Sequence, residues 1–350
     1  MDKFKAFLKR KNIEFSVKRY FLDALSAMAL GLFGSLLIGT ILKTLGEQIL
    51  AHCAATGGVA GMANFLVSAG TAASGMMGAA IGVAVASSLQ APNLVIFCSV
   101  VTGSVGATLG GPAGAFISAV IGAEFGKAVS KETKIDIIVT PAVVILMGQL
   151  TASLIGPGVS ALMNGLGSII MNATQMRPFA MGIIVAVVVG LVLTAPISSA
   201  ALCVMLSLSG LAGGAAVAGC SAQMVGFAVA SFKENGVGGL AAQGLGTSML
   251  QVSNIIRHPM ILIPPTVASA VVGPVSTVLF HMQCTPVGAG MGTCGLVGQI
   301  GTFTAMGFSW SILGMVLMTH VLLPGVIAYV VDFGMRKAGW IHDGDYKLDL

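Results

Sequence analysis

Long apolar runs alternate along the chain with short polar or glycine-rich interruptions. About 20 consecutive apolar residues are needed for a helix to cross the hydrocarbon core of a bilayer. The runs do not alternate between apolar and polar residues with a period of two, which disfavours a transmembrane β-barrel. We predict spanning segments at approximately 20–42, 69–89, 93–109, 112–129, 137–155, 179–195, 199–231, 259–280 and 309–332.

These segments predict an all-α polytopic membrane protein with roughly eight to ten transmembrane helices. The segment 199–231 is too long for one pass, so we expect it to be broken or re-entrant. The stretch 156–178 is only moderately apolar and is punctuated by Gly, Asn and Pro, so we expect it to lie along the outer surface without spanning.

Composition supports the membrane interpretation. Hydrophobic residues make up 56% of the chain and charged residues 8%, and the mean hydropathy is +0.97, whereas a soluble domain carries about 25% charged residues. The 48 glycines favour helices packed closely through small residues. No stretch is long and polar enough for a soluble domain, so we interpret 20–335 as one membrane transport domain, with halves at 20–135 and 136–335 as an open alternative.

Two glycine-rich interruptions in the last third resemble each other. The segment Gln243-Gly244-Leu245-Gly246-Thr247-Ser248 is echoed by Gly290-Met291-Gly292-Thr293-Cys294-Gly295. Irregular backbone at membrane depth is tolerated where it is buried in protein or lines a polar cavity, and paired breaks are typical of transporter substrate sites. We therefore expect 239–258 and 284–303 to form broken segments or re-entrant hairpins that meet at a cavity.

The side chains near these breaks are mainly amides and hydroxyls, which supply both donors and acceptors and suit a hydroxyl-rich, uncharged solute. Close helix packing through small residues is the alternative explanation, and a snorkelling arginine is the alternative for Arg257. The candidate solute-binding residues are Gln243, Thr247, Ser248, Gln251, Asn254, Thr293 and Gln299, with Arg257 and His258 at the rim; Thr140, Pro141, Ser198 and Ser199 are additional cavity-lining candidates.

Other reactive side chains have plainer interpretations. The cysteines, at 53, 98, 203, 220, 284 and 294, form no CxxC motif, so we interpret them as small core residues and expect no metal site or cofactor. We expect His320 to be hydrogen-bonded to the backbone and not to act as a proton relay. Asp332 and Arg336 have the spacing of an i,i+4 ion pair at the membrane edge.

Positive charge is concentrated at the two ends and in one internal loop. Residues 1–19 are rich in Lys and Arg and have a short apolar face, which predicts an amphipathic helix on the inner leaflet. The loop containing Lys127, Lys131 and Lys134 is also basic, and Arg336 and Lys337 precede the tail 336–350. The positive-inside rule places all three regions in the cytoplasm.

Several segments resemble a known family. They are Lys134–Pro141 (KIDIIVTP), Leu193–Ala201, Gln243–Gln251, Asn254–Pro259 and Gly288–Gln299. The chain resembles the enzyme IIC-type membrane proteins of the sugar phosphotransferase system, specifically the branch containing the perfringolysin O regulator-like proteins. The resemblance implies a multi-span permease in a bacterial inner membrane, a homodimer, and a sugar or sugar-like solute.

The chain also departs from that family. It lacks the Gly-Ile-Thr-Glu stretch of sugar-transporting enzyme IIC proteins, and it contains no phosphoryl-carrier domain, so phosphotransfer would need separate enzyme IIA and IIB proteins. Whether the chain is part of an enzyme complex stays open. Two other functions are also open: a phosphorylation-independent secondary transporter, with Asp23, His258 and His320 as coupling candidates, and a membrane sensor that regulates gene expression indirectly without contacting nucleic acid.

The charge distribution yields a topology test. In a cysteine-free variant, a cysteine introduced in place of Lys131 should resist a membrane-impermeant thiol reagent in intact cells and react after permeabilisation, because the loop 127–134 is expected in the cytoplasm. Labelling of this position in intact cells would place the loop outside and refute the topology.

Overall fold

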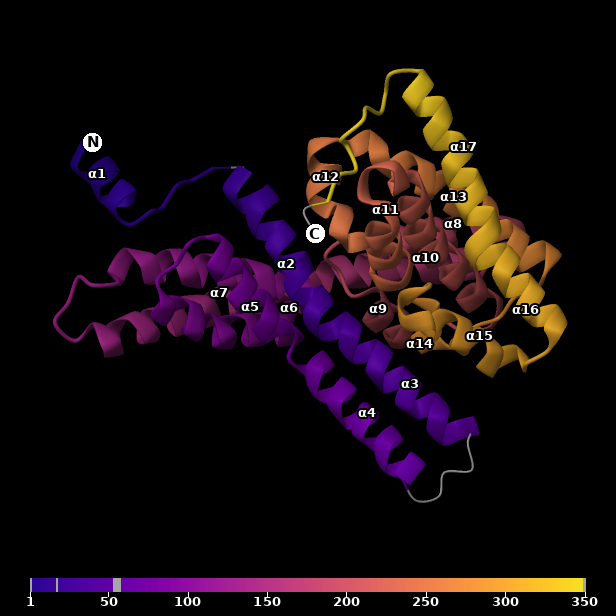
Figure 1. The fold of residues 1–350 in the computed structure, drawn as a ribbon, viewed down its shortest axis with the longest axis horizontal. Helices are drawn as coiled ribbons and strands as arrows, with labels where there is room; N and C mark the ends of the chain where they lie inside the picture. The colour runs from indigo at the N-terminus through magenta and orange to yellow at the C-terminus, as the bar shows by residue number, and fades with distance from the viewer. Residues whose placement is uncertain (1, 17, 53–57, 349–350) are drawn as a thin grey trace. The chain divides into compact units, whose positions relative to one another are not determined.

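A computed structural model of the chain describes residues 2–16, 18–52 and 58–348. The described residues form helices and no strand, with one isolated bridge between Gly210 and Cys284, which confirms the all-α prediction. The chain divides into two compact units, Met1–Leu162 and Met163–Leu350 (Figure 1). Their boundary lies within one long helix, and the division into halves at 20–135 and 136–335 stays a prediction.

Unit 1 begins with α1 (Asp2–Arg10) and a continuous helical stretch made of η1 (Lys18–Ala24), α2 (Leu25–Leu32), η2 (Phe33–Leu37) and α3 (Ile38–His52). The chain returns through α4 (Gly58–Gly75) and α5 (Met77–Ser88), which are bent by 49° where they join. Glycines allow the outgoing stretch α2–α3 to pack closely against the returning helices α4 and α5. A Cβ on Gly39 would lie 2.4 Å from Ser74 Oγ, and one on Gly31 would lie 2.8 Å from the Ala80 carbonyl oxygen.

Helix α6 (Asn93–Val129) is a tight hairpin of two helices and not one straight rod. The turn is at Gly110 and Gly111, where Gly111 has a φ of 58° that suits glycine. A Cβ on Gly106 would lie 2.3 Å from the Gly114 carbonyl oxygen, and one on Gly122 would lie 3.0 Å from Thr102 Cγ2, so the two legs run antiparallel in contact. The legs match the spans predicted at 93–109 and 112–129.

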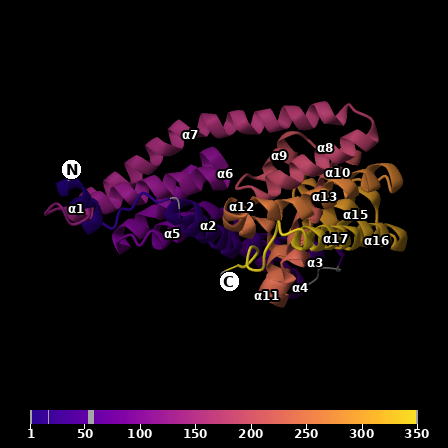
Figure 2. The same cartoon turned by 90° about the horizontal axis from the view of Figure 1, so that it is seen from above.

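Helix α7 (Asp136–Thr174) is 39 residues long and runs as one continuous coil (Figure 2). It includes the span predicted at 137–155 and continues through Pro157. The stretch 156–178 is therefore mostly helical, although its Gly, Asn and Pro content indicated a surface connection. Prolines are tolerated within long apolar membrane helices because neighbouring helices, Ser or Thr side chains, ordered waters and local 3₁₀ or π turns satisfy the freed carbonyls.

The basic N-terminal segment is attached to the charged turn between α6 and α7. Arg10 Nη2 and Lys11 Nζ lie 2.7 and 2.5 Å from Glu132 Oε1, and Lys127 Nζ donates to the Asn12 carbonyl at 2.8 Å. The hydrogen bond from Lys11, together with the Arg10 charge, lowers the pKa of Glu132. The N-terminal segment and the 127–134 loop thus lie at the same end of unit 1; which side of the membrane that end faces stays a prediction.

Unit 2 is built around the buried helix α10 (Gly210–Ala230). It packs against α8 (Pro178–Thr194), α13 (Ile263–Pro274, between η5, Pro259–Leu262, and η6, Val275–Leu279) and α17 (Leu323–Lys337). Helix α9 (Ser199–Met205) is separated from α10 by residues 206–209, so the predicted break within 199–231 is confirmed. The last span consists of α16 (Trp310–Leu317), η8 (Met318–Leu322) and α17.

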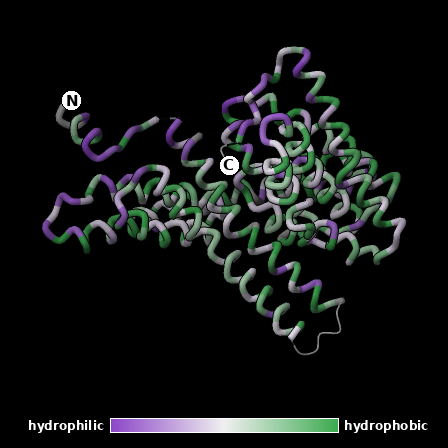
Figure 3. Tube along the Cα trace, in the orientation of Figure 1, coloured by the Kyte–Doolittle hydropathy of each residue, from purple (hydrophilic) through white to green (hydrophobic). Residues whose placement is uncertain are grey.

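By length and composition, the described residues contain six helices that could cross a membrane, or up to seven if the bent α4–α5 pair is one span. The sequence pattern predicted roughly eight to ten spans. Part of the difference comes from α6, whose two antiparallel legs count as one helix in this total, and from α8, which is shorter than the others. Figure 3 shows apolar residues along these helices and hydrophilic residues in α1, in the α6–α7 turn and around the C-terminal tail.

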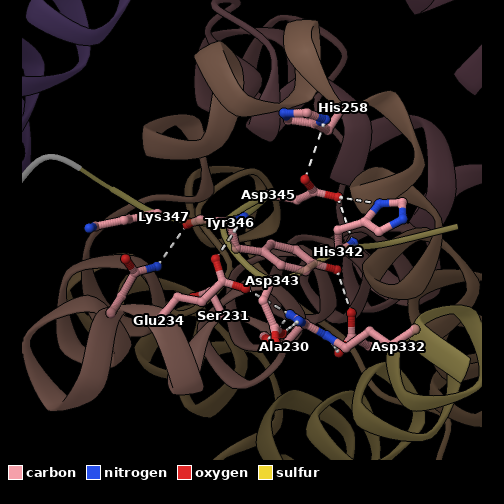
Figure 4. Close-up of polar contacts among 12 residues, drawn as sticks. Ala230, Ser231, Glu234, His258, Asp332, His342, Asp343, Asp345, Tyr346 and Lys347 are labelled. Carbon is pink, nitrogen blue, oxygen red and sulfur yellow. Dashed lines mark hydrogen bonds and ion pairs between the residues drawn. The ribbon is translucent and has the colours of Figure 1, made fainter. Parts of the chain in front are cut away.

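The tail that follows α17 folds back onto unit 2 through Tyr346, whose side chain is fully buried. Its hydroxyl donates to Asp332 Oδ1 at 2.8 Å, and its backbone N–H donates to Glu234 Oε2 at 2.9 Å (Figure 4). Arg336 donates to both carboxylates, so the predicted Asp332–Arg336 pair exists within a larger network. Burial, reinforced by the Asp332 charge, raises the pKa of Tyr346, so its phenol keeps the proton that it donates.

The buried phenol makes Tyr346 a test of tail docking. Tyr346→Phe should lower the unfolding free energy by about 1.5–3 kcal/mol, because a hydrogen bond to a carboxylate is lost and Asp332 stays buried. Tyr329→Phe is the matched control, since Tyr329 is 56% exposed and only stacks on Phe333. Thermal unfolding of the detergent-solubilised proteins measures the stability of both variants. Equal unfolding midpoints for Tyr346→Phe and Tyr329→Phe would contradict the docked tail.

Candidate functional site

Both glycine-rich segments in the last third are interrupted helices, as predicted. The first consists of α11 (Phe232–Ala241), η3 (Ala242–Gly246), an extended Thr247, η4 (Ser248–Gln251) and α12 (Val252–Arg257). The second consists of α14 (Pro286–Ala289), a turn, η7 (Cys294–Leu296) and α15 (Val297–Met306). Left-handed φ values at Gly292, Gly295 and Leu296 allow the second reversal. Whether either segment is re-entrant in a membrane stays a prediction.

The two breaks contact each other. Thr293 Oγ1 donates to the Gly244 carbonyl at 2.5 Å, which joins the middle of the second break to the middle of the first. Gly292 lies against α10 so closely that a Cβ there would be 2.8 Å from the Ser221 backbone nitrogen. The polar backbone of both breaks is therefore brought together beside the most buried helix of unit 2.

Three of the candidate residues form a continuous chain of buried amides. Gln243 Nε2 donates to Ser231 Oγ and to the Gly239 carbonyl, at 2.8 and 3.1 Å. Gln251 Nε2 donates to Gln243 Oε1 at 2.9 Å and to the Tyr346 carbonyl at 3.0 Å. Asn254 Nδ2 donates to Gln251 Oε1 at 2.8 Å and to the Lys347 carbonyl at 2.9 Å.

An amide group has two hydrogens to donate, and in each of these three residues both have protein acceptors. Gln251 and Asn254 thus hold the first break to the C-terminal tail, and Gln243 supports Gln251 from the other side. While the tail is docked, none of them has an amide hydrogen left for a solute.

Ser248 belongs to a second, deeper group of polar side chains. Its hydroxyl lies 2.8 Å from Thr194 Oγ1, which also approaches Gln223 Oε1 at 3.3 Å. Gln223 Nε2 reaches Thr266 and Ser269 on α13. Ser248 therefore connects the first break to α8, α10 and α13.

The remaining hydroxyl candidates mostly satisfy backbone groups. Thr247 Oγ1 accepts from the Met249 N–H and caps η4, and Ser198 accepts from the Ala201 N–H and caps α9. Ser199 Oγ donates to the Gly290 carbonyl at 2.6 Å, which links the break before α9 to the second break. Together with the bond from Thr293 to Gly244, the Ser199 bond joins the break before α9 to the other two breaks.

Five candidates lie elsewhere. Arg257 and His258 are exposed, and His258 Nδ1 lies 3.4 Å from Asp345 Oδ1 at the tail (Figure 4). Thr140 and Pro141 belong to unit 1, where Thr140 Oγ1 donates to Asp136 at the start of α7. Asp23, the coupling candidate, is exposed in η1.

Gln299 pairs with His320 in the interior. Gln299 Nε2 lies 3.1 Å from His320 Nδ1, and both side chains are buried. The expectation that His320 bonds to backbone is wrong, because its partner is a side chain that the second break positions. Gln299 Oε1 and His320 Nε2 have no protein partner, and neither does Ser221 Oγ on α10.

Sequence patterns alone missed Ser221. It is a single serine within a Gly- and Ala-rich buried helix, where packing through small residues is the ordinary explanation. Its spacing of two residues from Gln223 is the only signal of a polar interior that the sequence carries at this point.

Four of the described cysteines are core residues, as predicted, whereas Cys98 is only half-buried. Cys203, Cys220, Cys284 and Cys294 are buried, and Cys220 and Cys284 approach the carbonyls of Val189 and Gly298. Cys53 lies outside the described residues. Among the described residues, no group of three or more His, Cys, Asp or Glu side chains is arranged to hold a metal ion.

Comparison with known proteins identifies the family. No curated protein and no solved structure matches the chain, and its place in the perfringolysin O regulator-like branch stays a prediction. A family model described as "Phosphotransferase system, EIIC" matches residues 22–348, nearly the whole chain. With its long apolar helices and paired interrupted segments, the chain belongs to the EIIC family of the sugar phosphotransferase system, and it is a multi-pass membrane permease component of that system.

Proposed function

We propose that this permease binds and translocates a neutral, hydroxyl-rich solute, a sugar or a close analogue, at the seam between its two interrupted segments. The seam is defined here as residues 243–254 and 290–299. The observation that carries the proposal is the hydrogen bond from Thr293 to the Gly244 carbonyl, which joins two broken segments in the interior of unit 2. Paired broken helices are where transporters of other folds place their substrates.

The chemistry of the seam favours a neutral solute. Its buried polar side chains are hydroxyls and amides, which offer donors and acceptors without net charge. The charged groups Glu234, Asp332 and Arg336 are paired with one another at the tail. An anionic solute would favour several arginines in bidentate contact, and Arg257 at the rim is exposed.

The candidate residues then have two kinds of role. Thr247, Ser248, Thr293 and Gln299 line the seam and are proposed to contact the solute, with Arg257 and His258 at the rim. Gln243, Gln251 and Asn254 support the first break from the tail side, and Ser199 supports the second break through Gly290. Ser198 caps the helix that holds Ser199.

We also propose partner proteins, an oligomeric state and a membrane for this permease. Separate enzyme IIA and IIB proteins would deliver the phosphoryl group from the cytoplasm, where the basic termini and the 127–134 loop are placed by the positive-inside rule. The permease itself is proposed to be a homodimer in a bacterial plasma membrane.

Binding to purified protein tests the solute class. Protein in detergent or in proteoliposomes, without phosphoryl partners, is offered radiolabelled neutral hexoses and hexitols, with sugar phosphates and amino acids for comparison. Saturable binding of a neutral sugar or polyol is expected. Binding confined to sugar phosphates or amino acids would refute the proposal.

Thr293→Val tests the seam itself. The change keeps the side-chain shape, removes the donor to Gly244 and leaves a buried carbonyl without its partner, at a cost of about 1–3 kcal/mol. We expect about a tenfold loss of affinity for the neutral solute that the wild-type protein binds. Thr304→Val is the control: this exposed threonine on α15 bonds only to its own helix at Ile300. Equal affinities for the two variants would show that the seam bond does not matter for binding.

A further inference from the structure

Ser221 Oγ, Gln299 Oε1 and His320 Nε2 are the buried side-chain nitrogen and oxygen atoms without a hydrogen-bond partner in the described part of unit 2. Ser221 and His320 are fully buried, and Gln299 is 8% exposed. Buried polar atoms are normally paired, so each exception calls for a ligand, a water or another explanation. Here three exceptions come from three helices of the same unit.

The three residues face the same region. Gln299 and His320 are in direct contact at 3.1 Å. Ser221 lies on α10 midway between Val217 and Val225, and residues four apart share a helix face. Val217 Cγ2 lies 2.5 Å from the Cβ position of Gly298, next to Gln299, and Val225 Cγ1 lies 3.6 Å from that of Gly325 on α17. The Ser221 face of α10 is therefore the face that contacts α15 and the helix carrying His320.

Irregular backbone positions two of the three groups. Gln299 is in the first turn of α15, directly after the left-handed residues Gly295 and Leu296. His320 is in η8, a π-helical turn of Met318–Leu322. Such π-turns within helices occur frequently at functional sites.

The hydrogen-bonding capacity of the Gln299–His320 pair matches a hydroxyl group. If the Gln299 amide nitrogen donates to Nδ1, the free groups are the Gln299 oxygen, an acceptor, and Nε2–H, a donor. If the amide is turned around, the free groups are its NH₂, a donor, and Nε2, an acceptor. Either way the pair offers one donor and one acceptor, which is what an O–H group needs, and Ser221 can give and accept one more bond.

We propose that Ser221, Gln299 and His320 are the hydroxyl-binding groups of the solute site, selecting a neutral sugar or polyol with at least two hydroxyls close together. The proposal rests on the proposed function, which it deepens by naming Ser221 and His320 as specificity residues. It also explains why an amide, a hydroxyl and an imidazole lie buried beside the second break with bonding capacity unused.

The test uses two variant proteins, a double variant and the single variant Ser221→Ala. In Gln299→Met/His320→Phe both polar partners are replaced by apolar groups of similar shape, which avoids leaving one buried group unpaired and keeps the protein folded. Radiolabelled glucose, galactose and mannitol are the probes, together with deoxy analogues of whichever probe the wild-type protein binds. Unfolding midpoints are measured alongside.

We expect the double variant and Ser221→Ala to bind the probe at least about tenfold more weakly than wild type, with unfolding midpoints unchanged. Removing one hydroxyl from the probe should weaken binding to wild type and have a much smaller effect on the variants, because the two changes remove the same contact. Thr319→Val is the control that should bind as wild type does, since this buried neighbour of His320 bonds to its own helix at Met315.

Other outcomes overturn the proposal in distinguishable ways. Folded variants that bind the probe as tightly as wild type would show that the three groups hold a bound water only, and the proposed function would survive. If wild-type protein binds no neutral sugar or polyol, the proposed function fails and this assignment fails with it. Equal losses of affinity for the probe in Thr319→Val and in the double variant would indicate that Gln299 and His320 only pack the interior.

Discussion

Every polar backbone group exposed by an interrupted helix must find a partner, because an apolar chain in a bilayer has no water to supply one. This constraint accounts for several of the hydroxyl side chains at the breaks of unit 2. Thr293 serves the Gly244 carbonyl, Ser199 serves the Gly290 carbonyl, and Thr247 serves the Met249 N–H. The breaks exist because hydroxyls lie where the helical bonds are missing, and their irregular backbone is tied into one seam as a result.

Glycine provides the second constraint, by controlling how closely the helices approach. A Cβ on Gly219 or Gly214 of α10 would lie 2.0 Å from the carbonyl oxygen of Ala186 or Met282, and one on Gly273 would lie 2.2 Å from the Gly182 oxygen. No side chain fits at such distances, so α8, α10 and α13 are held in contact by backbone. This close contact defines the faces of α10 and thereby the direction in which Ser221 points.

The sequence predicts those parts of the fold that depend on local patterns. Apolar length locates the helices and the two legs of α6, and the repeated Gly-Thr context locates the two breaks. The partners of the polar side chains are a different matter. Gln251 and the Tyr346 carbonyl are 95 residues apart, and Gln243 and Gln251 read from the sequence as open amides because nothing local shows that the tail returns to them.

Long-range contacts also decide which predicted residues remain free to bind. Gln299 was selected for its glycine-rich context, but its significance depends on His320, which lies 21 residues away on another helix. The sequence pattern does not single out Ser221, because a serine in a helix of small residues normally serves only to pack that helix against its neighbours. Whether such a residue is structural or functional is decided by its hydrogen-bond inventory, which only the folded chain shows.

That inventory separates the polar groups of unit 2 into three kinds. Charged groups are paired at the tail, the amides of the first break are saturated by one another and by the tail backbone, and the groups beside the second break keep unused capacity. A solute that entered the seam would therefore gain most from the second break and the helix of His320. The Thr293–Gly244 bond holds the first break against the second beside these groups, so losing it would disturb the geometry that the incoming hydroxyls meet.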